Sequence, residues 1–191
     1  MKIHDISREL LSAPIYPGDP SPTTEPLCSI AGGDFYNLSW LTMTSHSGTH
    51  IDAPRHFIED GKAIDEMELS HFVGECTVIE IDGIFTVDEI LPVLRVCKKH
   101  LLIKGTAVIT AETASAIAEA GILLLGIETL TVGPLDAPMA VHQILLRKEI
   151  AILESLDLSK IEPGTYTLFA APVKIGGCDG APCRAILIEN L

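Results

Sequence analysis

The chain has 191 residues, of which 47% are hydrophobic and 5% aromatic, and its formal net charge is −13. This length fits one domain, residues 1–191, with enough aliphatic side chains for a sizeable core. The acidity excludes the basic surface of a nucleic-acid-binding protein and disfavours contact with anionic membranes, and the apolar runs are too short to span a bilayer.

The cysteines and the N-terminus favour a reduced, cytoplasmic protein. The chain has five cysteines, an odd number, and no C-x-x-C motif. Its first residues, M-K-I-H-D-I-S, lack the apolar stretch of a signal peptide. Free thiols are therefore expected. Cys178 and Cys183 are interpreted as small core or loop residues rather than as zinc ligands or a redox pair.

The first quarter of the chain predicts two strands separated by a proline-rich segment. Residues 2–6 are expected to form a short strand, and the prolines between residues 14 and 26 exclude a helix or a central strand. Residues 37–44 alternate apolar and polar side chains, which predicts a half-buried strand that Trp40 helps to pack.

The rest of the chain mixes apolar strands with short helices. Thr110 is a suitable N-cap for an alanine-rich helix that ends at Gly121, and residues 122–127 are continuously apolar, which is typical of a strand buried on both faces. Without a strict βαβ rhythm, this mixture predicts an α/β domain with a mixed sheet. The other predicted elements are strands at 76–81, 101–104, 151–154, 165–171 and 184–189 and a helix at 140–147.

Residues 45–57, S-H-S-G-T-H-I-D-A-P-R-H-F, contain three of the seven histidines. On an extended chain, His46, His50 and Asp52 have the same parity and face one way. Gly48 allows the backbone to bend, and Pro54 turns the chain. The histidine at position 56 can therefore return to the point at which the other three side chains meet.

Two imidazoles and a carboxylate that converge on one point are typical of a zinc, manganese or iron site. Three protein ligands leave a coordination position for water, which is the catalytic arrangement. His56 would then be a nearby base that need not bind the ion. A single histidine is usually a structural residue, so the prediction depends on the four groups together.

The string H-S-G-T-H-I-D-A-P-R-H, residues 46–56, resembles the H-x-G-T-H-x-D-x-P-x-H signature of the cyclase-like metal hydrolases. That family includes the bacterial kynurenine formamidases and the isatin hydrolases. The resemblance extends along nearly the whole chain. Its other segments are D-I-S and Y-P-G-D near the start, G-I-E and P-L-D in the centre, and D-G-A-P-C-R-A at 179–185.

The resemblance implies a particular ligand set. His46, His50 and Asp52 would hold one divalent ion, zinc or manganese. Asp52 would bridge to a second ion held with His142 and Glu154, so that each subunit binds one or two ions. Without the resemblance, His142 and Glu154 look like ordinary residues of a short helix and a strand end.

The resemblance also implies the remaining roles and the fold. His56 would be the acid/base catalyst, and Tyr16 would lie in the pocket of a small-molecule substrate. The implied fold is a single swivelling α/β domain whose central, partly barrel-like mixed sheet is flanked by helices. Such domains usually assemble as homodimers or homotetramers.

These features predict a metal-dependent hydrolase of a C–N amide bond, either in an aryl formamide or in a small cyclic amide. One alternative is a cyclase or dehydratase that acts on an enolisable substrate, and another is a non-catalytic metal- or ligand-binding protein. Two departures concern the substrate. Kynurenine formamidases have Trp where this chain has Tyr16, and their segment between the strand at 101–104 and the helix after Thr110 is longer.

Overall fold

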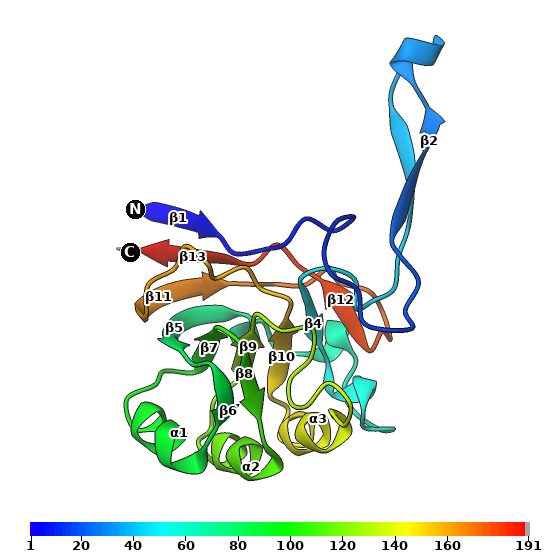
Figure 1. The fold of residues 1–191 in the computed structure, drawn as a ribbon. Coiled ribbons are helices and arrows are strands. Elements are labelled where there is room, and N and C mark those ends of the chain that lie inside the picture. Colours follow the sequence, from blue (N-terminus) through cyan, green and yellow to red (C-terminus); the bar gives the residue numbers. More distant parts are fainter. Residues whose placement is uncertain (190–191) are drawn as a thin grey trace.

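The centre of the protein is a nine-stranded mixed sheet that curves into a half-barrel, as seen in a computed structural model that describes residues 1–189 (Figure 1). The strand order is β1-β13-β11-β5-β7-β9-β10-β4-β12. β5, β7, β9 and β10 run parallel, and the other neighbours pair antiparallel. The predicted α/β class with a partly barrel-like mixed sheet is confirmed. The strands are β1 (Lys2–Asp5), β4 (His50–Asp52), β5 (Val73–Glu80), β7 (His100–Lys104), β9 (Leu124–Ile127), β10 (Ala151–Glu154), β11 (Gly164–Phe169), β12 (Gly180–Pro182) and β13 (Ile186–Glu189).

Three α-helices connect the parallel strands and lie on one side of the sheet (Figure 1). α1 (Val87–Leu94) joins β5 to β7, α2 (Ala111–Glu119) joins β7 to β9, and α3 (Met139–Leu146) joins β9 to β10. Parallel neighbours require such crossovers. Two short strands, β6 (Gly83–Phe85) and β8 (Ala107–Ile109), pair in parallel in a separate two-stranded sheet.

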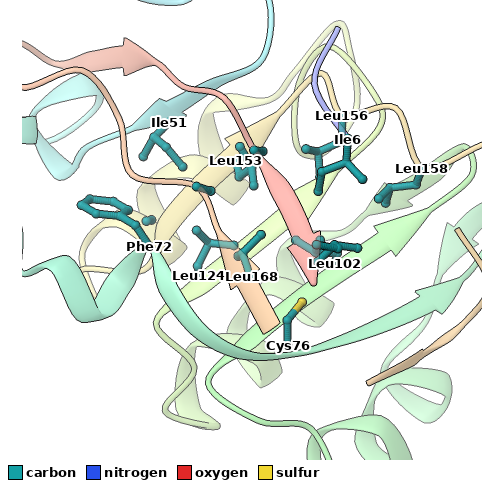
Figure 2. Close-up of a cluster of buried hydrophobic side chains, with 14 of the residues drawn as sticks. Ile6, Ile51, Phe72, Cys76, Leu102, Leu124, Leu153, Leu156, Leu158 and Leu168 are labelled. Carbon is teal, nitrogen blue, oxygen red and sulfur yellow. The ribbon is translucent and has the colours of Figure 1, made fainter. Parts of the chain in front are cut away.

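Alternate side chains of the parallel strands enter two hydrophobic clusters. Leu101 and Ile103 pack with residues of the helices, whereas Leu102 belongs to the cluster inside the half-barrel. Figure 2 shows this inner cluster, in which Leu102 lies with Phe72 and Leu168. The two clusters occupy opposite faces of one sheet. That residues 1–191 form a single domain stays a prediction.

The helix from residue 110 is confirmed, but α1 was not predicted. The hydroxyl of Thr110 accepts a hydrogen bond from the N–H of Thr113 at 3.2 Å, which is the expected N-cap. α1 has an equally clear signal, because Thr86 and Glu89 form a capping box. Pro92 lies inside this helix and argues against it in the sequence.

A two-stranded ribbon projects from the sheet (Figure 1). It consists of β2 (Thr23–Cys28) and β3 (Leu38–Thr42), and a short 3-10 turn, Ile30–Gly32, lies at its tip. We call residues 23–42 the arm. β2 forms although it contains Pro26, because it pairs only with β3 in an isolated ribbon.

The predicted half-buried strand at 37–44 is wrong about burial. β3 is exposed along its whole length, and Trp40 is 60% exposed rather than packed. Alternation predicts burial of one face only if another layer covers that face. Within the described residues, no layer covers the arm.

No helix in the described part of the chain is both long enough and apolar enough to cross a membrane.

Candidate metal centre

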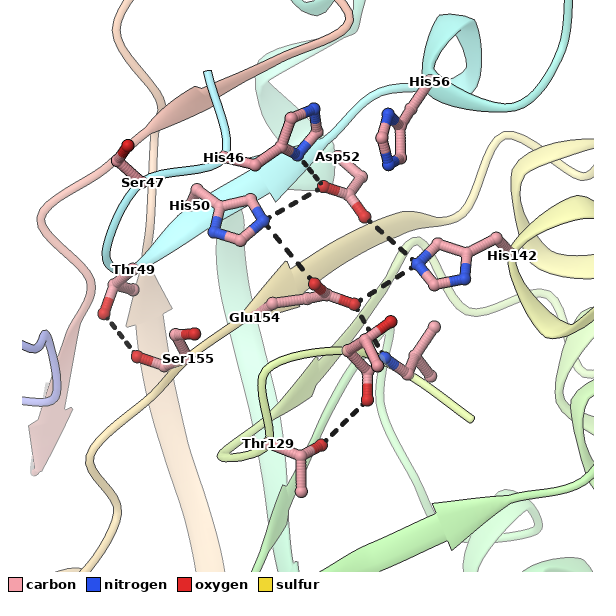
Figure 3. A network of polar contacts seen from close by, with 12 residues as sticks. His46, Ser47, Thr49, His50, Asp52, His56, Thr129, His142, Glu154 and Ser155 are labelled. Atoms are coloured by element: carbon pink, nitrogen blue, oxygen red, sulfur yellow. Dashed lines mark hydrogen bonds and ion pairs between the residues drawn. The ribbon is translucent and has the colours of Figure 1, made fainter. Parts of the chain in front are cut away.

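Three elements and one turn bring five predicted ligands together (Figure 3). His50 and Asp52 lie on β4 with the same parity, and Glu154 lies on the neighbouring strand β10, opposite His50. His142 projects from α3, and His46 comes from the turn before β4. The side chains of His50, Asp52, His142 and Glu154 are at most 5% exposed.

His46 reaches the site by a different route from the one predicted. β4 begins only at His50, and the chain turns at residues 45–49, where Gly48 has φ +65°. The extended arrangement is therefore wrong for His46, while the predicted bend at Gly48 is confirmed. The ring still converges, because its Nδ1 lies 2.8 Å from Asp52 Oδ1.

Backbone carbonyls fix the orientation of two of the rings. Nδ1 of His50 donates to the Gly48 carbonyl and Nδ1 of His142 donates to the Pro138 carbonyl, each at 2.9 Å. A carbonyl only accepts, so each Nδ1 carries the proton and each Nε2 presents its lone pair to the site in the neutral ring. Metal-binding histidines are typically oriented in this way.

The carboxylates complete a donor set around one buried point. Nε2 of His50 lies 3.3 Å from Asp52 Oδ1 and 3.6 Å from Glu154 Oε2. Nε2 of His142 lies 3.6 Å from Asp52 Oδ2 and 3.4 Å from Glu154 Oε1. Glu154 Oε1 also accepts a hydrogen bond from the N–H of Val132 at 2.7 Å, and this bond fixes the carboxylate.

One buried oxygen without a hydrogen-bond partner indicates that this donor set binds an ion. Among residues 1–189, Asp52 Oδ2 is the one buried side-chain polar atom without a hydrogen-bond partner. Such an atom needs an explanation, and an ion is one. Ligand atoms lie within 4.8 Å of one another in two groups, His46 with Asp52 and His56, and His50 with Asp52 and Glu154. This mixture of nitrogen and oxygen donors fits a divalent transition metal, with Asp52 common to both groups.

The same crowding shifts the pKa values of the metal-free site. Burial disfavours charged His50 and His142, but hydrogen bonds to Asp52 and Glu154 outweigh it and raise the pKa of each ring to about 10. Burial also opposes ionisation of Asp52, yet the close approach of the three surrounding histidines holds its pKa well below the usual range. Without an ion, protons on the imidazoles balance the carboxylates.

A pH dependence of stability follows for the metal-free protein. The folded pKa values of about 10 for His50 and His142 exceed the unfolded value of about 6.5. Their contribution to stability is complete below pH ~6.5 and is lost as the pH rises towards ~10. We expect the melting temperature of chelator-treated protein to fall across this window, measured by scanning calorimetry. The metal-loaded protein is the control, because an ion replaces these protons; identical profiles for the two forms would contradict the expectation.

Asp179 belongs to this site, although no role was predicted for it. Its Oδ2 lies 2.8 Å from His46 Nε2 and 3.3 Å from His56 Nδ1, and its Oδ1 accepts from the Ser45 hydroxyl at 2.9 Å. Although burial opposes ionisation, the His46 bond lowers the pKa of Asp179 to about 2. The next residue, Gly180, permits the approach, since a Cβ there would lie 2.9 Å from the His46 ring. In the sequence, the aspartate–glycine pair at 179–180 is the one signal that could have indicated a role for Asp179.

His56 lies at the edge of the site, as the turn at Pro54 predicts. The 3-10 turn Pro54–His56 brings its ring centroid within 4.0 Å of that of His46. Burial, together with the nearby His46 and His142, lowers the pKa of His56, and the charges of Asp52 and Asp179 only partly offset this. The ring is therefore neutral at pH 7.

A cavity of about 390 Å³ opens onto the site. His46, His50, His56 and His142 line it together with Tyr16, whose hydroxyl donates to the Leu135 carbonyl at 3.1 Å. The predicted site residues therefore all lie around one cavity, in which Asp52 is buried beneath the histidines. The roles assigned to them stay predictions.

Other motif residues have structural positions. Glu128 of the G-I-E segment accepts from the N–H groups of Gly105 at 2.6 Å and Leu158 at 2.7 Å. The five cysteines are free, and burial raises the pKa of the Cys183 thiol to about 12. Cys178 and Cys183 pack against the inner hydrophobic cluster, in keeping with their interpretation as core residues.

Comparison with known proteins supports the resemblance. A family model described as "Putative cyclase" matches residues 4–134. The chain is 34% identical to a kynurenine formamidase from Erythrobacter litoralis, with 98% of this chain and 94% of that protein covered. The chain belongs to this cyclase family. The histidine-rich segment at 46–56 falls inside the matched region, whereas His142 and Glu154 lie beyond it.

Solved structures show the same fold as this cyclase-family chain. A potential metal-dependent hydrolase with cyclase activity is 25% identical, with a TM-score of 0.84 and with 100% of this chain and 98% of that chain covered. Isatin hydrolase A from Labrenzia aggregata is 21% identical, with a TM-score of 0.86 and with 99% and 94% covered. The predicted family is confirmed by these matches.

Proposed function

We propose that the chain is a metal-dependent hydrolase that cleaves the C–N bond of a small amide, either an aryl formamide or a small cyclic amide. The observation that carries the proposal is the convergence of three histidines and Glu154 around the Asp52 carboxylate, whose Oδ2 lacks a hydrogen-bond partner, beneath an open cavity. The kynurenine formamidases among its relatives support amide cleavage.

His46, His50 and Asp52 would hold one ion, and Asp52, His142 and Glu154 would hold a second. Zinc and manganese both suit these donors. A divalent ion there would supply a Lewis acid, which lowers the pKa of a water from about 15.7 to about 7 and polarises a carbonyl.

His56 is the acid/base residue of the proposed reaction. Its Nδ1 faces Asp179, so Nε2 is the nitrogen left to exchange protons. The neutral ring takes a proton from the attacking water, whose oxygen bonds to the amide carbon. As the C–N bond breaks, the same ring delivers the proton to the departing nitrogen. The balance is one amide and one water converted to one carboxylic acid and one amine.

The cavity fits an aryl substrate. Its volume of about 390 Å³ is at the small end of ligand pockets, and Tyr16 and Phe57 line it with aromatic surface. A ring of the substrate can stack on these side chains while its amide faces the histidines.

Tyr16 gives a separate prediction about substrate binding. We expect Tyr16→Ala to raise KM about fivefold with little change in kcat, because an aromatic contact contributes roughly 1 kcal/mol. Tyr16→Phe is the matched variant: it loses only the bond to the Leu135 carbonyl and should keep KM within about threefold. Steady-state kinetics on an aryl formamide measure both. Equal KM values for the wild type and Tyr16→Ala would remove this residue from the pocket's function.

The experiment that tests the function combines metal analysis with isotope labelling. Protein purified without chelator is analysed for zinc and manganese and then screened on aryl formamides and cyclic amides in ¹⁸O-water. The proposal expects bound metal and one ¹⁸O in the acid product. A product isomerised or dehydrated without ¹⁸O would indicate a cyclase or dehydratase instead. Bound metal without turnover on any amide would indicate a binding protein.

The five free thiols support a reducing compartment for this enzyme, and we place it in the cytoplasm.

A further inference from the structure

The permanent charges around the cavity above the candidate metal centre are of one sign. No lysine or arginine occurs among the described residues that line it, whereas Asp19 and Glu154 are acidic. Glu154 is buried at the floor, where its carboxylate lies 3.6 Å from His50 Nε2 and 3.4 Å from His142 Nε2. Asp19 is exposed and therefore lies where the cavity opens to solvent. It is the charged residue that a substrate meets at the mouth.

A tight turn holds Asp19 beside Tyr16. The N–H of Asp19 donates to the Tyr16 carbonyl at 3.0 Å, with Pro17 and Gly18 between the two residues. Gly18 has φ +102°, the left-handed conformation that the third position of a type II turn requires. The segment Y-P-G-D therefore places an aromatic ring and a carboxylate together at the cavity mouth.

An aromatic ring with a neighbouring carboxylate suits a positively charged group. Cations are attracted to the faces of aromatic rings, and Phe57 adds a second ring to the lining. The net charge of −13 acts in the same direction, because an acidic protein attracts cations to its surface and repels anions. A carboxylate on the outer part of a substrate would meet no lysine or arginine in this lining.

We propose that the cavity selects its substrate by charge and that Asp19 is a specificity-determining residue. The favoured substrate is an aryl amide whose ring carries a cationic group, such as an ammonium, on the side away from the amide. A neutral ring is accepted, and a carboxylate at that place is rejected. This inference rests on the proposed amide hydrolysis and assigns Asp19 a role in binding, not in bond cleavage.

Three formanilides of nearly constant shape test the charge preference. Their para methylene group carries trimethylammonium, its neutral isostere tert-butyl, or carboxylate. At low ionic strength, kcat/KM should be about fivefold higher for the ammonium than for the tert-butyl compound and about fivefold lower for the carboxylate, mainly through KM. Asp19→Asn should bring the first two within about twofold and leave the neutral substrate unchanged. Asp136→Asn, an exposed residue outside the lining, is the control and should keep the wild-type ranking.

Binding without turnover separates this inference from the proposed function. The corresponding aryl methyl ketones have no C–N bond to cleave and are titrated into zinc-loaded protein by calorimetry. The ammonium ketone should bind more tightly than the tert-butyl ketone in the wild type but not in Asp19→Asn. Equal affinities in the wild type, or the same ratio in both proteins, would overturn the inference. The expected ratio without cleavage of any formamide would contradict the proposed function and leave charge selection standing.

A separate observation concerns Asp179, which contacts two histidines through one oxygen. Oδ2 accepts from both rings, so the carboxylate ties a candidate ligand, His46, to His56. We infer that Asp179 is a positioning residue: it holds His56 as the Nδ1–H tautomer, with Nε2 free. This inference rests on the proposed role of His56.

The tautomer of His56 is measurable without turnover. Long-range ¹H–¹⁵N spectra of zinc-loaded protein should show the His56 proton on Nδ1, and Asp179→Asn should shift part of it to Nε2. The same variant should lower kcat about 10–100-fold with KM nearly unchanged. Asp65→Asn is the control, because Asp65 accepts from the Gly177 N–H of the same loop. Wild-type His56 protonated on Nε2, or an unaltered tautomer in Asp179→Asn, would overturn the inference even if no amide is cleaved.

Discussion

Asp52→Asn is expected to abolish metal binding while leaving the chain folded. Asp52 is 1% exposed, approaches the rings of His46, His50 and His142, and supplies the oxygen that lacks a partner. Asparagine has the same shape, but its amide nitrogen cannot bind an ion and its side chain is neutral. The substitution therefore removes the charged ligand that is common to both groups of ligand atoms. We expect elemental analysis to find less than about one-tenth of the wild-type metal and turnover at least ~10³-fold lower, because the ligands couple binding to activity.

The control for Asp52→Asn is Asp82→Asn. Asp82 lies outside the site and accepts hydrogen bonds from Thr106, so its loss tests a general effect of removing a carboxylate. Circular dichroism verifies that both variants are folded. Full metal occupancy in Asp52→Asn would contradict the assignment of Asp52 as the shared ligand and leave the orphaned oxygen without an explanation.

The part of the site that is local in sequence could be predicted. His50 and Asp52 share a face because β4 is extended, and Pro54 returns the chain as expected. Parity along an extended chain does not account for the position of His46, because a turn at Gly48 rather than a strand directs its ring. Short-range geometry was thus sufficient to indicate which residues meet, although not how each one arrives.

The distant residues could not be found in this way. Glu154 meets His50 only because β10 pairs with β4, and Asp179 approaches only because β12 pairs with the other edge of β4. Sheet register over more than 100 residues leaves no periodic signal in one sequence. The family resemblance supplied His142 and Glu154, but Asp179 gained a role only from its contacts with His46 and His56.

Two errors in the fold have different physical origins. Without α1 the regular βαβ succession between β5 and β10 is not apparent, and Pro92 hides that helix. In the arm, the alternation of side chains predicts burial that the structure does not have. This second error depends on what lies over the segment, and a segment's own residues do not specify the covering layer.

His56→Gln is expected to keep the metal and lose turnover. Its ring lies beside Asp179 and lines the cavity, and burial lowers its pKa, so it is a neutral base at pH 7. Glutamine can replace the hydrogen bond but cannot carry a proton, so kcat should fall about 10²–10⁴-fold with normal metal content. In the wild type, activity should rise with pH through a value below about 6.5, the unperturbed pKa of histidine. That acidic limb should vanish from the pH profile of the variant.

The control for His56→Gln is His4→Gln, which alters a histidine that is paired with Glu189 far from the cavity. This variant should retain both the rate and the acidic limb of the pH profile. An unchanged rate in His56→Gln would assign proton transfer to another group.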